Sequence, residues 1–283
     1  MPNYYDEYYA HWKLVPISYA LESNEVQSNS SVFINYLNGC FFNHTFITYV
    51  DQVCDLKTPA NPDITCVGTI WVSHDDQAII LMFRGTTTNP ELYEEEGDYN
   101  LTVPFPGGGT VQKWYYNAFT IIWNAGLRDA LLTAKNTYPS YELWVTGLSL
   151  GGGLSSLAAP YISQMGYFDK NNMKLLNFGA MRVGKPDFVA RFPSLVPWAY
   201  RVVHRYDIVP HWFQDFGFIN YAKEIWYNNT MDNGDPWIEC DQVESLQCSD
   251  SVNSSLYTFN DHQYFKHRSC VKFTTPPPPT TSP

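Results

Sequence analysis

Residues 141–159, YELWVTGLSLGGGLSSLAA, place one serine between an apolar run and a run of small residues. Gly147 and Gly151 bracket Ser149 at the spacing Gly-x-Ser-x-Gly. The apolar run predicts a buried strand that ends at the serine, and residues 150–164 predict a helix that begins there. A strand, a sharp turn and a helix in this order are typical of a nucleophile elbow, which lifts a serine hydroxyl above the edge of a sheet.

Two other interpretations of these glycines are open. A glycine-rich turn without chemistry would explain the same five residues. A phosphate-binding loop would need Gly-Lys-Ser/Thr, or Gly-x-Gly at the start of the turn, and the stretch has neither. The strand and helix patterns on either side favour the elbow.

The rest of the chain alternates between strand and helix patterns. Apolar residues recur at three- and four-residue steps from Val111 to Ala125, which predicts an amphipathic helix, and a covering helix is expected at residues 6–21. Short unbroken apolar runs are typical of strands buried on both faces, at residues 78–83, 143–145, 174–178 and 199–203. The pattern predicts an α/β fold with a mainly parallel central sheet flanked by helices.

Composition narrows the class of protein. The chain has 283 residues and 45% hydrophobic residues, enough for one large core, and we expect a monomeric single domain over residues 1–273 with a proline/threonine-rich tail at 274–283. A net charge of −11 argues against nucleic-acid binding and against strong attraction to anionic membranes.

The sequence has no run of about 18 apolar residues that would predict a transmembrane segment. No His-x-x-x-His pattern suggests a metal site, so we expect no metal and no cofactor.

Cysteines and glycosylation sequons indicate a secreted protein. The cysteines are Cys40, Cys54, Cys66, Cys240, Cys248 and Cys270, an even number at wide spacing. Asn-x-Ser/Thr sequons occur at Asn29, Asn43, Asn100, Asn228 and Asn253. The first residues lack the basic end and apolar core of a signal peptide, so we expect a mature form or a sequence whose start is missing.

A nucleophilic serine needs an acid and a histidine, which follow it in that order in this kind of fold. Asp207 comes just after the predicted strand 199–203, although it would also suit a turn. The histidines after Ser149 are His204, His211, His262 and His267. His204 precedes the acid, and His211 lies only four residues beyond it. His262 and His267 therefore remain as candidates.

The tetrahedral oxyanion needs two hydrogen-bond donors. One is the amide of Leu150, the residue after the serine. The other is expected in an early loop that follows a buried strand, and Thr86 has this position after Arg84 and Gly85. A polar turn at the end of strand 78–83 would explain these residues equally well.

Several motifs together resemble the class 3 lipases, the fungal-lipase-like family of α/β-hydrolases, and especially its secreted nematode members. They occur in the order of the family over about residues 5–270: FRGTT, WVTGLSLGGGLSSLAA, FGAMRVGKPDF, YRVVHRYDIVPH, EIWYNNTM and DHQYF.

The resemblance implies a disulfide-stapled α/β-hydrolase fold and a role for each candidate. Ser149 would be the nucleophile, Asp207 the acid and His262 the base. Thr86 and Leu150 would form the oxyanion hole. Cysteine spacing alone leaves 15 connectivities open. The resemblance implies the pairs Cys40–Cys270, Cys54–Cys66 and Cys240–Cys248.

The chain departs from the family pattern at three places. Leu148 stands where a histidine usually precedes the nucleophile. Ala180 and Met181 replace a glutamine and a proline. One residue fewer than usual separates His262 from Tyr264, and a displacement of about 1 Å can cost two orders of magnitude in rate.

The segment at residues 88–109 corresponds to the family's lid, and its first half is acidic. The resemblance thus predicts a secreted serine ester hydrolase, a lipase acting on acylglycerol esters with transient contact to a lipid interface. Two alternatives are a catalytically impaired lipase-like binding protein and a soluble carboxylesterase or feruloyl-type esterase.

Overall fold

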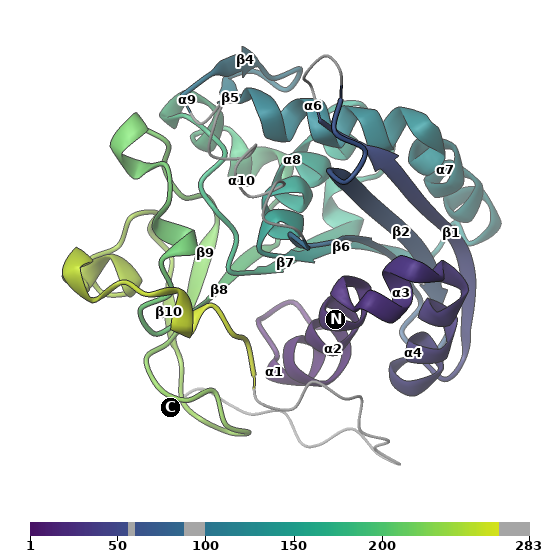
Figure 1. Ribbon diagram of the computed structural model, residues 1–283, viewed down its shortest axis with the longest axis horizontal. Coiled ribbons are helices and arrows are strands. Elements are labelled where there is room, and N and C mark those ends of the chain that lie inside the picture. The colour runs from purple at the N-terminus through teal and green to yellow at the C-terminus, as the bar shows by residue number, and fades with distance from the viewer. Residues whose placement is uncertain (56–59, 88–99, 266–283) are drawn as a thin grey trace.

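The computed structural model describes residues 1–55, 60–87 and 100–265. Its centre is an eight-stranded sheet with the strand order β1-β2-β3-β6-β7-β8-β9-β10 (Figure 1). A small hairpin of β4 (Thr102–Pro104) and β5 (Thr110–Gln112) lies apart from it. The strands of the central sheet are β1 (His44–Val53), β2 (Thr65–Ser73), β3 (Ala78–Phe83), β6 (Glu142–Leu148), β7 (Met173–Phe178), β8 (Ala199–His204), β9 (Lys223–Tyr227) and β10 (Ile238–Cys240).

The middle of the sheet is parallel. Strands β3, β6, β7, β8 and β9 pair in parallel, whereas β1–β2, β2–β3 and β9–β10 are antiparallel. Every residue of β3, β7 and β8 is buried, as expected for strands covered on both faces. The expectation of a mainly parallel sheet is confirmed, and the four predicted apolar runs are β3, β6, β7 and β8.

Helices cover both faces of this sheet (Figure 1). The helix bounds are α1 (Glu7–Tyr9), α2 (Val15–Glu22), α3 (Asn24–Ser28), α4 (Phe33–Cys40), α6 (Lys113–Ile122), α7 (Arg128–Thr137), α8 (Leu150–Gln164), α9 (Pro186–Val189) and α10 (Phe192–Leu195). One π-helical turn, Ala10–Leu14, joins α1 to α2, and another, Trp123–Leu127, joins α6 to α7. Short 3-10 turns occupy Ser30–Val32, Lys170–Asn172, Val209–His211, Gln214–Phe216, Ser249–Ser251, Ser254–Leu256 and Phe259–Asp261.

The alternation of side chains along each strand divides the core into two clusters. Ile79, Leu81 and Phe83 of β3 join the cluster that includes α6 and α8. Ile80 and Met82 join the cluster beneath the N-terminal helices. Because α2 packs on the second face, residues from the start of the chain reach the edge of the sheet at which β3 and β6 end.

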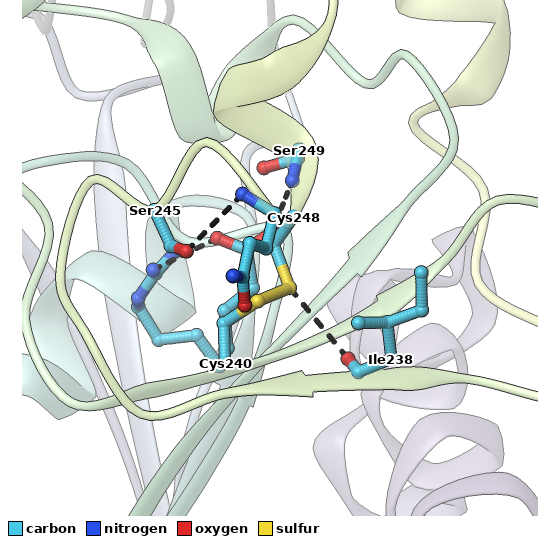
Figure 2. Close-up of a disulfide and its surroundings, with 8 residues drawn as sticks. Ile238, Cys240, Ser245, Cys248 and Ser249 are labelled. Atoms are coloured by element: carbon cyan, nitrogen blue, oxygen red, sulfur yellow. Dashed lines mark hydrogen bonds and ion pairs between the residues drawn. A yellow bond between two sulfur atoms is a disulfide. The ribbon is translucent and has the colours of Figure 1, made fainter.

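Two disulfides stabilise the periphery. Cys54 bonds to Cys66 near the end of β1, and Cys240 of β10 bonds to Cys248 (Figure 2). Each pair agrees with the pairing that the family resemblance implies. The expected Cys40–Cys270 pair stays a prediction, because Cys270 lies outside the described ranges. Residues 88–99 of the predicted lid and the tail at 274–283 also lie outside them.

Candidate active site

Ser149 occupies a strained turn between β6 and α8. Its backbone angles are φ 57° and ψ −124°, a region that residues with a side chain rarely adopt. Its amide donates to the carbonyl of Phe178 at 2.9 Å, and its carbonyl accepts from the amide of Gly153 at 3.1 Å. These bonds keep the turn between a buried strand and a 15-residue helix.

Close backbone approach explains the two bracketing glycines. A Cβ at Gly147 would lie 2.2 Å from the Gly151 carbonyl, and one at Gly151 would lie 2.1 Å from the Phe83 oxygen. Neither contact is possible for a real side chain, because both neighbours are backbone atoms. The residues at these positions must therefore be glycines for β6 and α8 to meet at this angle.

The two candidate oxyanion donors flank the serine. Leu150 is the first residue of α8, so its amide belongs to the first turn of a helix, whose amides lack intrahelical partners. Thr86 follows β3, which pairs in parallel with β6 so that Phe83 lies opposite Gly147. The sheet register thus brings the loop of Arg84, Gly85 and Thr86 to the serine turn.

Asp207 and His262 form a close pair. The Nδ1 atom of His262 lies 2.8 Å from Oδ2 of Asp207, whose side chain is fully buried. Oδ1 of Asp207 accepts from the amide of Val209 at 3.0 Å, and the hydroxyl of Tyr264 donates to Oδ2 at 2.6 Å. Burial raises the pKa of the Tyr264 hydroxyl well above its ordinary value, and the charge of Asp207 adds to this. Tyr264 is therefore a protonated donor at neutral pH.

Ser149, His262 and Thr86 meet in one cavity of about 180 Å³. The other side chains that line it are Tyr19, Glu22, Leu148, Val209, Trp212 and Phe259. Within the described residues no hydrogen bond joins the Ser149 hydroxyl to the His262 ring. Such bonds are often long without substrate and shorten when it binds.

His204 and His211 do not line this cavity. His204 bridges the carbonyls of Asp261 (3.0 Å) and Asn229 (2.9 Å) through its two ring nitrogens, which is a structural role. His211 stacks on Tyr257 at 4.0 Å and lies 3.3 Å from Asp250. His267 lies outside the described residues.

The structure shows which residues contact the chain at the three departures from the family pattern. Leu148 is buried and forms part of the cavity wall. A Cβ at Gly152 would lie 2.7 Å from the Cβ of Ala180, so Ala180 packs directly on the first turn of α8. The shorter spacing after His262 still lets both its ring and Tyr264 reach Asp207.

Sequence reasoning missed four residues of this site. Tyr19 and Glu22 come from the N-terminal helix α2, and no local motif distinguishes them. The sequence pattern indicates Tyr264 only through its spacing from His262. Gly179 has φ +54°, and a Cβ there would lie 2.7 Å from Cε1 of His262, so a larger residue would displace the imidazole.

A serine on a strained strand-to-helix turn, with a buried aspartate–histidine pair at the same cavity, defines a serine hydrolase of the α/β-hydrolase fold. The family model described as Lipase (class 3) matches residues 80–216. The chain belongs to the class 3 lipase family, whose activity is ester hydrolysis.

Relatives and solved structures agree with this assignment. The chain is 32% identical over 256 residues to "Lipase ZK262.3" of Caenorhabditis elegans. This alignment covers 79% of this chain and 70% of that protein. It is 33% identical over 228 residues to "Secreted mono- and diacylglycerol lipase 1" of Fusarium solani, covering 69% and 67%. Lipase II from Rhizopus niveus has the same fold, with a TM-score of 0.76 at 23% identity and coverage of 94% and 95%.

Proposed function

We propose that this lipase hydrolyses acylglycerol esters through an acyl-enzyme formed on Ser149. The observation that carries the proposal is the 2.8 Å contact between His262 and the buried Asp207, next to a serine held on a strained turn in the same cavity. The remaining cavity wall is largely apolar, which suits the acyl part of an ester.

Each residue of the site has a defined role in this mechanism. His262 removes the proton of the Ser149 hydroxyl as its oxygen attacks the ester carbonyl. Asp207 holds the imidazole in the tautomer with the proton on Nδ1 and stabilises the imidazolium. The amides of Thr86 and Leu150 donate to the oxyanion. The tetrahedral intermediate collapses, and the leaving alcohol takes the proton from His262.

Water then completes the cycle. His262 activates a water molecule, which attacks the acyl carbonyl and passes through a second oxyanion. The acid leaves, and Ser149 regains its proton.

A fluorophosphonate probe tests this proposal. Wild-type protein should be labelled, and Ser149→Ala should not, while both retain the same thermal unfolding midpoint. Equal labelling of the two proteins would overturn the assignment of Ser149. Absence of labelling in wild type would favour a catalytically impaired lipase-like protein.

We further propose that the protein is secreted and that residues 1–273 form one domain. The five sequon asparagines are all exposed, as glycan attachment requires: Asn29, Asn43, Asn100, Asn228 and Asn253. Two described disulfides and a relative named as secreted support the same location. Within the described residues no helix is long and apolar enough to cross a membrane. The test of secretion is made on protein expressed in a eukaryotic secretory host. We expect treatment with an N-glycosidase to decrease its mass.

A further inference from the structure

A buried arginine that does not line the candidate catalytic cavity bonds to both of the segments that carry the acid and the base. We define the acid segment as residues 205–212 and the histidine segment as residues 249–262. Arg182 comes after β7, and its side chain is fully buried. Its Nη1 atom donates to the carbonyl of Pro210 in the acid segment at 2.6 Å. Its Nη2 atom donates to Oδ1 of Asp250 in the histidine segment at 2.9 Å. One guanidinium therefore joins the two segments.

Glu244 fixes the orientation of this guanidinium. Nε of Arg182 donates to Oε1 of Glu244 at 3.0 Å, and Nη2 donates to Oε2 at 2.7 Å. Two parallel bonds of this kind hold the planar group in one orientation. Glu244 has φ +53°, which is uncommon for a residue with a side chain. The Cys240–Cys248 disulfide closes the loop that carries Glu244 (Figure 2). A closed loop thus holds the arginine whose remaining nitrogen, Nη1, bonds to Pro210.

The charges in this cluster suit positioning better than stability. Burial disfavours the charged form of Arg182, but the hydrogen bond with Glu244 and the charges of Glu244 and Asp250 outweigh it and raise its pKa. Removing these charges from water offsets much of their mutual attraction, so a buried ion-pair network adds less net stability than its contacts suggest. An arginine fork still fixes its partners in one geometry, which a lysine ammonium cannot do because it is a point charge.

The acid and histidine segments also pair directly with each other. The amide of Thr258 donates to the carbonyl of Tyr206 at 2.8 Å, and the amide of Ile208 donates to the carbonyl of Thr258 at 3.4 Å. Arg182 joins the same two segments at a second place, through Pro210. Two attachments limit rotation of one segment against the other. This matters for the reaction, because a displacement of about 1 Å can cost two orders of magnitude in rate.

We infer that Arg182 is a positioning residue, which keeps the Asp207 carboxylate in contact with the His262 ring by joining the segments that carry them. Glu244 supports this role by fixing the orientation of the guanidinium. Neither Arg182 nor Glu244 lines the catalytic cavity, so both act through other residues. The inference rests on the proposed function, since it needs Asp207 and His262 to act on Ser149.

The test uses two variants of this cluster. Arg182→Lys keeps the charge and removes the fork, whereas Glu244→Gln keeps the shape and removes a charge. One set of measurements gives kcat and KM separately for nitrophenyl butyrate, below the thermal unfolding midpoint of every protein. The other is the NMR signal of the proton on Nδ1 of His262, which reports the hydrogen bond to Asp207 and which a general loss of stability would not move.

Arg201→Lys is the matched control. Arg201 is also fully buried, and it donates to the carbonyl of Tyr221 at 2.6 Å and to Oε2 of Glu224 at 3.0 Å. Both acceptors lie outside the acid and histidine segments. Oε1 of Glu224 accepts from the Ser249 amide at 2.9 Å, and this bond does not involve Arg201. The control therefore disturbs a buried ion pair of the same kind and leaves the acid segment attached.

We expect kcat to fall roughly tenfold to a hundredfold in Arg182→Lys, and less in Glu244→Gln. KM should change little, because neither residue lines the cavity that takes the ester. The His262 proton signal should move, because Asp207 is held less firmly. Arg201→Lys should lower the unfolding midpoint and keep the wild-type kcat and proton signal. Since Glu244→Gln is nearly isosteric, it carries the test if Arg182→Lys does not fold.

Two results would overturn the role of Arg182 and leave the proposed function intact. One is an unchanged kcat and proton signal in both cluster variants, with activity still abolished in Ser149→Ala. The other is an equal loss of kcat in Arg201→Lys, which would show that damage to any buried ion pair slows the reaction. Absence of fluorophosphonate labelling in wild type would instead overturn the proposed function.

Discussion

Tyr264 and His262 donate to the same carboxylate oxygen, Oδ2 of Asp207, at 2.6 and 2.8 Å. The two donors are only two residues apart in the sequence, so one short segment supplies both hydrogen bonds to this oxygen. The amide of Val209 donates to the other oxygen. A fully buried carboxylate is thus satisfied by three protein donors, which is what a buried charge requires.

Removal of the Tyr264 hydroxyl should weaken both stability and rate. Tyr264→Phe takes away one charge-assisted bond, so we expect a loss of about 2 kcal/mol in the free energy of unfolding. We expect kcat/KM for a nitrophenyl ester to fall about tenfold, because the imidazole is held less firmly. Urea unfolding and steady-state kinetics measure the two effects. Tyr257→Phe is the control, since its hydroxyl lies 3.5 Å from the Ser249 carbonyl and away from Asp207. Equal losses in both variants would contradict the role of Tyr264.

Neutralisation of Asp207 should affect rate far more than structure. Asp207→Asn can still accept from Val209, but its amide group favours the wrong imidazole tautomer, and we expect kcat to fall by about four orders of magnitude. Asp261→Asn is the matched control, because this carboxylate accepts only from the Tyr206 amide at 3.4 Å among the described contacts. Near-wild-type kcat in Asp207→Asn would show that another group orients His262.

The sequence predicted the middle of the fold well for a physical reason. Strands buried on both faces appear as unbroken apolar runs, and the runs at β3, β6, β7 and β8 stand out from polar surroundings. Strands β1 and β2 gave no such signal. The residues of β1 are mostly half-buried or exposed, so its sequence mixes polar and apolar side chains.

The sequence predicts the site residues that lie in local motifs. It does not predict those that reach the site from elements far away in the chain. Ser149 lies in a local strand–turn–helix pattern, and Asp207 lies three residues beyond the end of β8. Tyr19 and Glu22 enter the cavity only because α2 packs across the end of the sheet. No periodicity within α2 distinguishes these two residues from their neighbours, so a three-dimensional structure was needed to find them.

The glycines of the elbow should differ sharply from a glycine on the surface. Gly147→Ala would place a methyl group 2.2 Å from backbone atoms of Gly151, and we expect it to destabilise the protein by about 3 kcal/mol or more. Gly166→Ala is the control, because Gly166 has φ +70° and open space around it, so only backbone strain of about 1 kcal/mol is expected. Thermal unfolding of the purified variants measures both. A Gly147→Ala protein as stable as Gly166→Ala would contradict the described junction of β6 and α8.

A buried ion-pair network should make stability depend on pH in the acid range. The fully buried Arg182 donates to Glu244 at 2.7 Å and to Asp250 at 2.9 Å. Burial opposes ionisation of Asp250, but the hydrogen bond with His211 and the charge of Arg182 outweigh it and lower its pKa.

A carboxyl group whose pKa is lower in the folded state stabilises the protein above its unfolded pKa of about 3.9, and this stabilisation is lost as the pH falls through the folded value. Asp250→Asn should therefore lower the urea midpoint at pH 7, and the difference from wild type should shrink below about pH 4. Urea titrations at pH 7, 5 and 3 test this, with the surface variant Asp129→Asn as the control. A difference between wild type and Asp250→Asn that stays constant down to pH 3 would show that the Asp250 charge does not stabilise the fold.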